Sequence, residues 1–129
     1  MANPKLLSLL LEGSKIWNNW RNLNPNMPID LVQANLVNAN LEGANLKNAN
    51  LKLADLREAN LRGANLQGAL IPRGTLEGAN LSRANLRGAS LNSTNLSGAN
   101  FTDAILIGAD LSRSTMIYTI LQGADISGC

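Results

Sequence analysis

The sequence offers few of the side chains that perform catalysis or bind metal ions. It contains no histidine, which removes the usual general base and the commonest metal ligand. Its one cysteine, Cys129, is the last residue, so neither a disulfide nor a cysteine-based metal site can form within one chain. The glycines recur at a regular spacing rather than in a phosphate-binding loop. The sequence therefore predicts no enzyme, no catalytic residue, no metal site and no cofactor.

Asparagine is the polar side chain that recurs at a fixed spacing. One set of asparagines that are twenty residues apart consists of Asn40, Asn60, Asn80 and Asn100. Such a ladder could form a polar binding surface, or its amides could bond to neighbouring turns and backbone. The second interpretation is favoured, because Asn side chains readily satisfy the backbone groups of turns.

The asparagines belong to a five-residue period that fills most of the chain. A large apolar residue occupies every fifth position, and a small residue, usually Ala, stands two positions earlier. Five fits neither the 3.6 residues of a helical turn nor the alternation of a flat strand. The chain must bend once per pentad, which is typical of stacked repeat architectures. The apolar positions are Leu31, Leu36, Leu41, Leu46, Leu51, Leu56, Leu61, Leu66, Ile71, Leu76, Leu81, Leu86, Leu91, Leu96, Phe101, Leu106, Leu111, Met116, Leu121 and Ile126.

The bends are expected two residues after each apolar position. Glycine often stands there, as at Gly43 and Gly63, and Asn48 takes the same place. A type II turn needs a positive φ at its second central residue, which Gly and Asn tolerate. Other residues are unfavourable at positive φ, so a different turn is expected at five corners. These corners are Leu53, Glu58, Arg73, Arg83 and Arg113.

The pentads resemble those of a known family. Ala39-Asn40-Leu41-Glu42-Gly43 and Ala64-Asn65-Leu66-Gln67-Gly68 are similar to the units of pentapeptide repeat proteins. The resemblance implies an all-β fold for residues 29–129, a right-handed quadrilateral β-helix with four pentads per coil. Residues twenty apart would then stack. About five coils would give a rod roughly 24 Å long.

Residues 1–28 follow a different pattern and are expected to form an α-helical cap and linker. Asn3 before Pro4 indicates a helix start, and Asn24-Pro25 ends the helix. A solenoid needs a lid over its first coil. The alternative is a helix lying on a membrane surface, since two tryptophans on one face suit an interface. The cap is favoured, and no membrane-spanning segment is expected. The proposed cap residues are Leu6, Leu10, Trp17 and Trp20.

The last coils carry apolar residues at positions that are polar earlier in the chain. Ile117, Tyr118 and Ile120 are expected to cluster at one corner, with Ile105 and Ile107 on the opposite face. Exposed apolar side chains beside an open sheet edge favour an interface with a partner. They make the C-terminal coil a candidate surface for homo-oligomer formation.

The predicted function is a non-catalytic structural or protein-interaction module with an unknown protein partner. The family resemblance also implies DNA-mimic binding to a type II topoisomerase, but the net charge of +2 opposes mimicry of a phosphate chain. Direct nucleic-acid binding is disfavoured, because the repeats lack stacking aromatics and a basic stripe. Trp17-Asn18-Asn19-Trp20-Arg21 before a repeat block resembles cyanobacterial proteins. That resemblance implies a cytoplasmic location, with the thylakoid lumen as the alternative.

Overall fold

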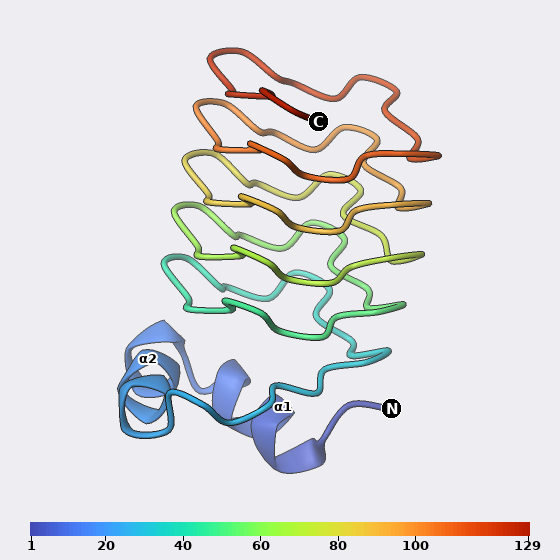
Figure 1. Ribbon diagram of the computed structural model, residues 1–129. Helices are drawn as coiled ribbons and strands as arrows, with labels where there is room; N and C mark the ends of the chain where they lie inside the picture. Colours follow the sequence, from blue (N-terminus) through green and yellow to red (C-terminus); the bar gives the residue numbers. More distant parts are fainter.

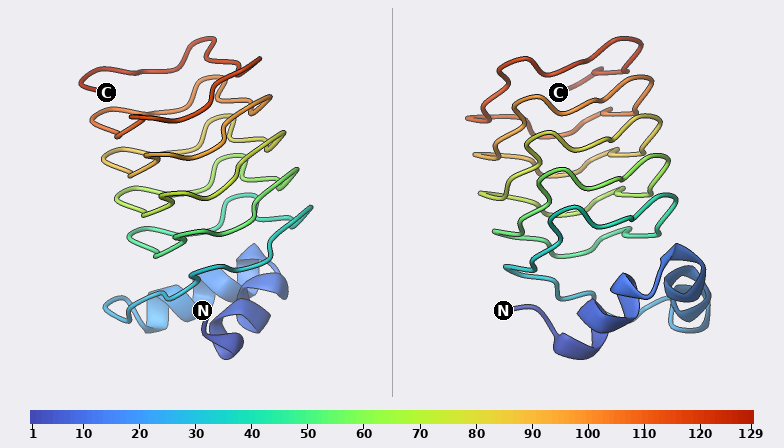
Figure 2. Two further views of the ribbon diagram at one scale, coloured as in Figure 1. Left: turned by 90° about the vertical axis from the view of Figure 1, so that its right-hand side faces the viewer. Right: turned by 180° about the vertical axis from the view of Figure 1, so that it is seen from behind.

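The chain winds into a stack of coils that stands on two short helices. The computed structural model describes residues 1–129. Helix α1 (Pro4–Leu11) and helix α2 (Ser14–Leu23) lie under the first coil, and the C-terminus ends the last coil at the opposite end (Figure 1). Two further views, from the side and from behind, show the coils stacked along one axis (Figure 2).

Parallel bridges between residues twenty apart hold the coils together. They recur at every fifth residue, from Asp30 with Asn50 to Ile105 with Asp125. Around each bridge the backbone bonds are short: Leu41 N–H donates to Asn60 O at 2.7 Å, and Asn60 N–H donates to Ala39 O at 2.9 Å. Each side of a coil contributes one bridging residue rather than a long strand. The twenty-residue stacking expected from the pentads is confirmed.

The apolar residues of the pentads fill the interior. From Leu31 to Leu106 they are all buried, and the small residues between them are buried too except Ala39, which is half-buried. Leu111, Met116 and Leu121 are half-buried, and Ile126 is exposed. Burying one leucine stabilises the fold by roughly 1.5–3 kcal/mol, so the rod gains stability coil by coil.

Three hydroxyl residues take inward positions that elsewhere hold Ala, and all three find carbonyl partners. Thr94 Oγ1 donates to Ile71 O at 2.7 Å across one coil, and Thr119 Oγ1 donates to Leu96 O at 2.7 Å in the same way. Ser114 Oγ donates to Leu111 O at 2.6 Å. The hydroxyls thus avoid the cost of an unsatisfied buried polar group.

All corners share one geometry, which corrects the expectation of a different turn at corners without Gly or Asn. From Gln33 to Gly128, the second central residue of every turn has φ between 57° and 72°. Leu53 N–H donates to Pro72 O at 3.1 Å, and Arg83 N–H donates to Thr102 O at 2.9 Å. Stacking on the next coil therefore holds the positive φ against local preference. The corrected corners are Leu53, Glu58, Arg73, Arg83 and Arg113.

The asparagines close the corners of their own coils. The Oδ1 of Asn60 accepts from the N–H of Arg62 at 3.1 Å, and the Oδ1 of Asn100 accepts from the N–H of Thr102 at 2.9 Å. A link between coils is weaker, with Asn60 Nδ2 3.3 Å from Asn40 Oδ1. The asparagine ladder therefore satisfies turn backbone, in agreement with the favoured interpretation.

The N-terminal segment contains two helices where the sequence predicts one helix up to Asn24. Asn3 Oδ1 caps α1 by accepting from Lys5 N–H at 3.0 Å and from Leu6 N–H at 3.3 Å. The helix ends because Gly13 adopts φ 122°, a conformation that side-chain-bearing residues rarely reach. This break lets α2 turn and lie against the first coil.

Candidate interaction surfaces

Side chains of α2 bond to the exposed edge of the first coil. Trp17 Nε1 donates to Asn45 O at 2.8 Å, and Arg21 Nη2 donates to Lys47 O at 2.8 Å. Asn18 Oδ1 accepts from Asn45 N–H at 2.7 Å. Three main-chain groups that have no coil beneath them are thereby satisfied.

One coil later, backbone groups make the same three bonds. Asn65 N–H donates to Ala44 O at 2.9 Å, and Asn65 O accepts from Leu46 N–H at 2.7 Å. Gln67 O accepts from Asn48 N–H at 2.9 Å. The side chains of α2 therefore replace the backbone that a preceding coil would supply.

The apolar cap residues lie at the same junction. Leu6, Leu10 and Trp17 are buried in the main apolar core. Trp20 is half-buried, and its ring centroid is 5.3 Å from that of Trp17. Arg21 is only 7% exposed, although arginine is mostly found on protein surfaces.

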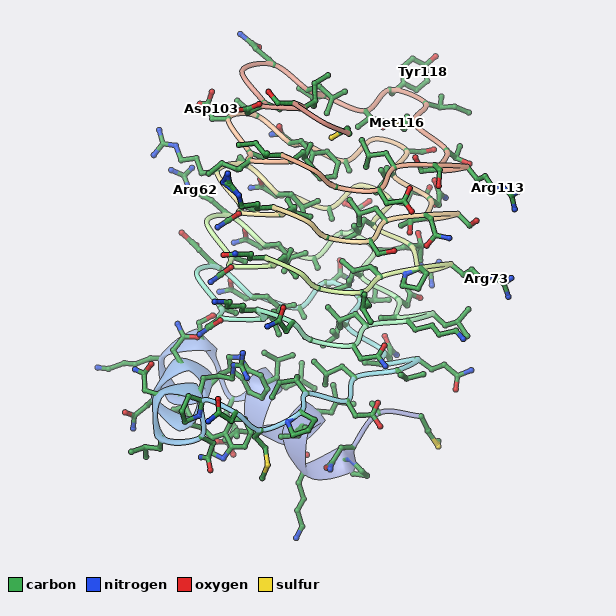
Figure 3. All side chains as sticks on the ribbon, in the orientation of Figure 1. Arg62, Arg73, Asp103, Arg113, Met116 and Tyr118 are labelled. Atoms are coloured by element: carbon green, nitrogen blue, oxygen red, sulfur yellow. The ribbon has the colours of Figure 1, made fainter.

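The apolar residues of the last coils lie on more than one face. Tyr118 is 90% exposed and Ile117 is 61% exposed, and both line one cleft. Figure 3 shows Tyr118 projecting away from the end of the rod. Ile120 is exposed on the next side of the coil, where it bridges Asn100. Ile105 is exposed and Ile107 is half-buried on the side opposite Ile117.

The cleft beside Tyr118 has a volume of about 330 Å³ and follows one corner of the rod. Gly78 and Gly98 form part of its lining and carry no side chains. Glu58 and Glu77 lie at its other end. Glu77 Oε2 accepts from Asn95 Nδ2 at 3.3 Å, and neither glutamate forms an ion pair. The cleft therefore combines two carboxylates with an exposed aromatic ring.

Charged side chains are distributed over all sides of the rod. The twenty-residue register places Lys52, Arg57, Arg62 and Lys47 on four successive sides. Arg62, Arg73 and Arg113 extend outward from the coils (Figure 3). The ion pair joins Arg57 Nη2 to Asp55 Oδ2 at 2.6 Å, and this hydrogen bond lowers the pKa of Asp55. The charges form no stripe of one sign.

Groups suited to metal binding do not converge in this structure. No cluster of three or more His, Cys, Asp or Glu side chains could hold an ion. Cys129 is exposed, and its Sγ lies 2.9 Å from Leu106 O. Neither helix is long and apolar enough to span a bilayer.

Comparison with known proteins identifies the repeat. A family model described as pentapeptide repeats matches residues 30–71, 73–106 and 94–129, with 8 copies. The chain belongs to the pentapeptide repeat family. Its pentapeptide repeat relatives imply that the β-helix is right-handed. No curated protein matches the chain.

Solved pentapeptide repeat proteins share this architecture. The protein Rfr23 from the cyanobacterium Cyanothece 51142 is 35% identical, with a TM-score of 0.69 over 70% of this chain and 63% of its own. A protein of the Arabidopsis thaliana thylakoid lumen is 36% identical, with a TM-score of 0.68 and the same coverage of both chains. The chain thus spans less than two thirds of the length of these two relatives.

The sequence pattern did not reveal the roles of Asn18 and Arg21 or the carboxylates of the cleft. The sequence did contain a signal for Asn18 and Arg21, because both lie on the same side of a helix as Trp17. Glu58 and Glu77 come together with Tyr118 only through the stacking of coils, which brings residues sixty apart to one corner.

Proposed function

We propose that this protein is a non-catalytic interaction module, a rod of about five four-sided coils that binds a protein partner along its side. The observation that carries the proposal is the cleft in which Ile117 and Tyr118 lie with Glu58 and Glu77. Exposed apolar residues that are grouped together mark interaction sites, and tyrosine is among the residues that dominate binding energy.

The chemistry of the cleft favours a partner segment with a cationic side chain beside an apolar one. The carboxylates of Glu58 and Glu77 form no ion pair, although Arg57, which pairs with Asp55, lies beside both. A lysine or arginine from the partner would meet the two carboxylates, and the partner segment would continue along the corner to the ring of Tyr118. An apolar neighbour would cover Ile117.

Tyr118 occupies its corner against conformational preference. Its φ is 58°, in a place where the two preceding coils have Gly78 and Gly98. A left-handed conformation costs a bulky residue about 1–2 kcal/mol. Retaining a large aromatic there, almost fully exposed, supports a role in binding rather than in folding.

Ile105 and Ile120 also replace a stabilising residue. They stand where other pentads have Asn, whose Oδ1 would accept the corner N–H two residues later. Isoleucine carries no side-chain acceptor for the N–H of Ile107 or Gln122. These isoleucines support a second contact area near the C-terminal coil, and a second copy of this chain is the occupant that we propose for it.

A peptide-display selection tests the lateral cleft. Peptides selected on the wild-type protein should be enriched in Lys or Arg beside an apolar residue. Tyr118→Ser and the double variant Glu58→Gln/Glu77→Gln should each weaken the selected peptides at least about tenfold, consistent with the loss of a central aromatic or of paired charges. The controls are Leu70→Ser and Glu42→Gln, which alter exposed residues of other sides. Equal binding by all variants would rule out this cleft.

Sedimentation analysis tests the second contact area. The wild-type chain should form dimers in a concentration-dependent manner, and Ile120→Lys should shift the equilibrium to monomer. A monomer at all concentrations would rule out self-association and leave the proposal for the lateral cleft unaffected.

We propose that the protein is located in the cytoplasm. The alternative is the thylakoid lumen, where the Arabidopsis relative is found, and cell fractionation would distinguish the two compartments.

A further inference from the structure

A second cleft lies at the junction between the cap and the first coil. It has a volume of about 290 Å³, near the lower limit for small-molecule sites. The linker after α2 forms one wall, with Pro25, Asn26 and Pro28, and the first coil forms the other with Lys47. The two prolines restrict the linker backbone, so this wall is held in shape by covalent geometry.

Arg21 lines the cleft as a buried cation without a counter-ion. The residue is 7% exposed, and its Nη2 donates one hydrogen bond, to Lys47 O. Its Nε is buried and has no hydrogen-bond partner. Its Nη1 has no protein acceptor either, but it is not among the buried atoms that lack a partner. No carboxylate pairs with this guanidinium, and burial lowers the pKa of Arg21.

A buried polar atom without a partner is costly, and no protein group accepts from the Nε of Arg21. The position near the C-terminal end of α2 favours a cation, but that effect is typically below about 1 kcal/mol. A second cation, Lys47, lines the same cleft, and the lining contains no acidic residue. The bond to Lys47 O accounts for one of the five N–H groups of the guanidinium.

From this arrangement we infer that the junction cleft binds a small molecule through an oxyanion group, phosphoryl or carboxylate. The oxyanion would accept hydrogen bonds from Arg21, pair with Lys47 and fill the space beside Asn26. Arginine suits this role because its planar donors match the geometry of such groups. Since Arg21 and Lys47 belong to the cap and to the coil respectively, the anion would tie the two together.

The test titrates the full chain with inorganic phosphate, sulfate or succinate at constant ionic strength, with chloride as the balancing ion. Amide resonances of residues 21–29, the two prolines excepted, and of residues 47–48 should shift and saturate with at least one of the three anions, with a dissociation constant of about 1–10 mM. Saturation by phosphate or sulfate alone identifies the phosphoryl class, and saturation by succinate alone identifies the carboxylate class.

Two matched lysine variants separate a site from a general salt effect. Lys47→Ala removes a cation from the cleft and keeps the carbonyl that Arg21 binds, so it should weaken binding about five- to tenfold. Lys52→Ala removes another exposed lysine, on a different side, and should leave binding unchanged. Phosphate and sulfate also act on many proteins without binding at a specific site. Such a general salt effect does not saturate with anion concentration, and it would be equal in the two variants. The absence of saturation with all three anions, or equal affinities of the two variants, would overturn the proposal.

Discussion

Asn18 and Asn45 are joined by a hydrogen bond of 2.7 Å from the backbone N–H of Asn45 to the side-chain oxygen of Asn18. In the next coil the equivalent N–H, that of Asn65, donates to the backbone oxygen of Ala44. A helix side chain therefore completes the ladder of the β-helix at its first edge. The cap therefore forms hydrogen bonds with the first coil in addition to covering its apolar interior.

Asn18→Ala should lower the free energy of unfolding by about 1–3 kcal/mol, because the partly buried N–H of Asn45 loses its acceptor. The Asn45 amide should also exchange its hydrogen faster. Asn19→Ala is the matched control, since Asn19 lies exposed on the same helix and makes no such bond. Chemical denaturation and hydrogen exchange measure both effects. Equal stability of the two variants would contradict the role of Asn18.

The corners offer a pair of opposite substitutions. Leu53→Gly should stabilise the protein by about 0.5–1 kcal/mol, because relief of the strain at φ 60° exceeds the entropy cost of glycine. Gly88→Ala should destabilise it by about 1 kcal/mol through φ alone, since an added Cβ meets no atom within 4 Å. Thermal unfolding of both variants checks the signs. Destabilisation by Leu53→Gly would show that the corner does not strain leucine.

How far the sequence predicts this molecule depends on whether an interaction is local or spans several coils. The repeat of Leu41 and its equivalents predicts the buried column, because one period fixes one interior. The positive φ of Leu53 could not be predicted from its local preference, since the neighbouring coil imposes it through Pro72 O. The cleft at Tyr118 combines residues from several coils, and their charges follow no period.

Ile120→Asn should stabilise the isolated chain by about 0.5–1.5 kcal/mol, because the new Oδ1 can accept from the N–H of Gln122. Leu70→Asn is the control, since Leu70 is similarly exposed but is followed two residues later by Pro72, which has no N–H. Denaturation in dilute solution measures the difference between the two variants. The same gain at both sites would contradict the turn-closing role of asparagine.

Acid should destabilise the protein, and the loss should be confined to low pH. Hydrogen bonds from Ser112 and Ser127 lower the pKa values of Asp110 and Asp125, and the hydrogen bond from Arg57 lowers that of Asp55. A carboxylate whose pKa is lower in the folded state stabilises the fold above its unfolded pKa, about 3.9, and loses that contribution as the pH falls through the folded value. Stability should therefore be constant down to about pH 5 and then decline progressively.

Asp110→Asn tests the acid response, because asparagine keeps an oxygen for the turn but does not titrate. The midpoint temperature of unfolding should fall less for this variant than for the wild type between about pH 4 and pH 2. A decline that begins above pH 5, or one that Asp110→Asn leaves unchanged, would contradict the assignment.

The outer surfaces are available for binding because Leu81 and its equivalents point into the rod. Leu81 has 0% of its surface exposed. The most direct test of this arrangement is the free energy of unfolding of Leu81→Ala beside that of Arg62→Ala, which truncates an exposed side chain. The buried column predicts a loss of about 2–5 kcal/mol for Leu81→Ala and a change within about 0.5 kcal/mol for Arg62→Ala. Equal small changes in the two variants would contradict it.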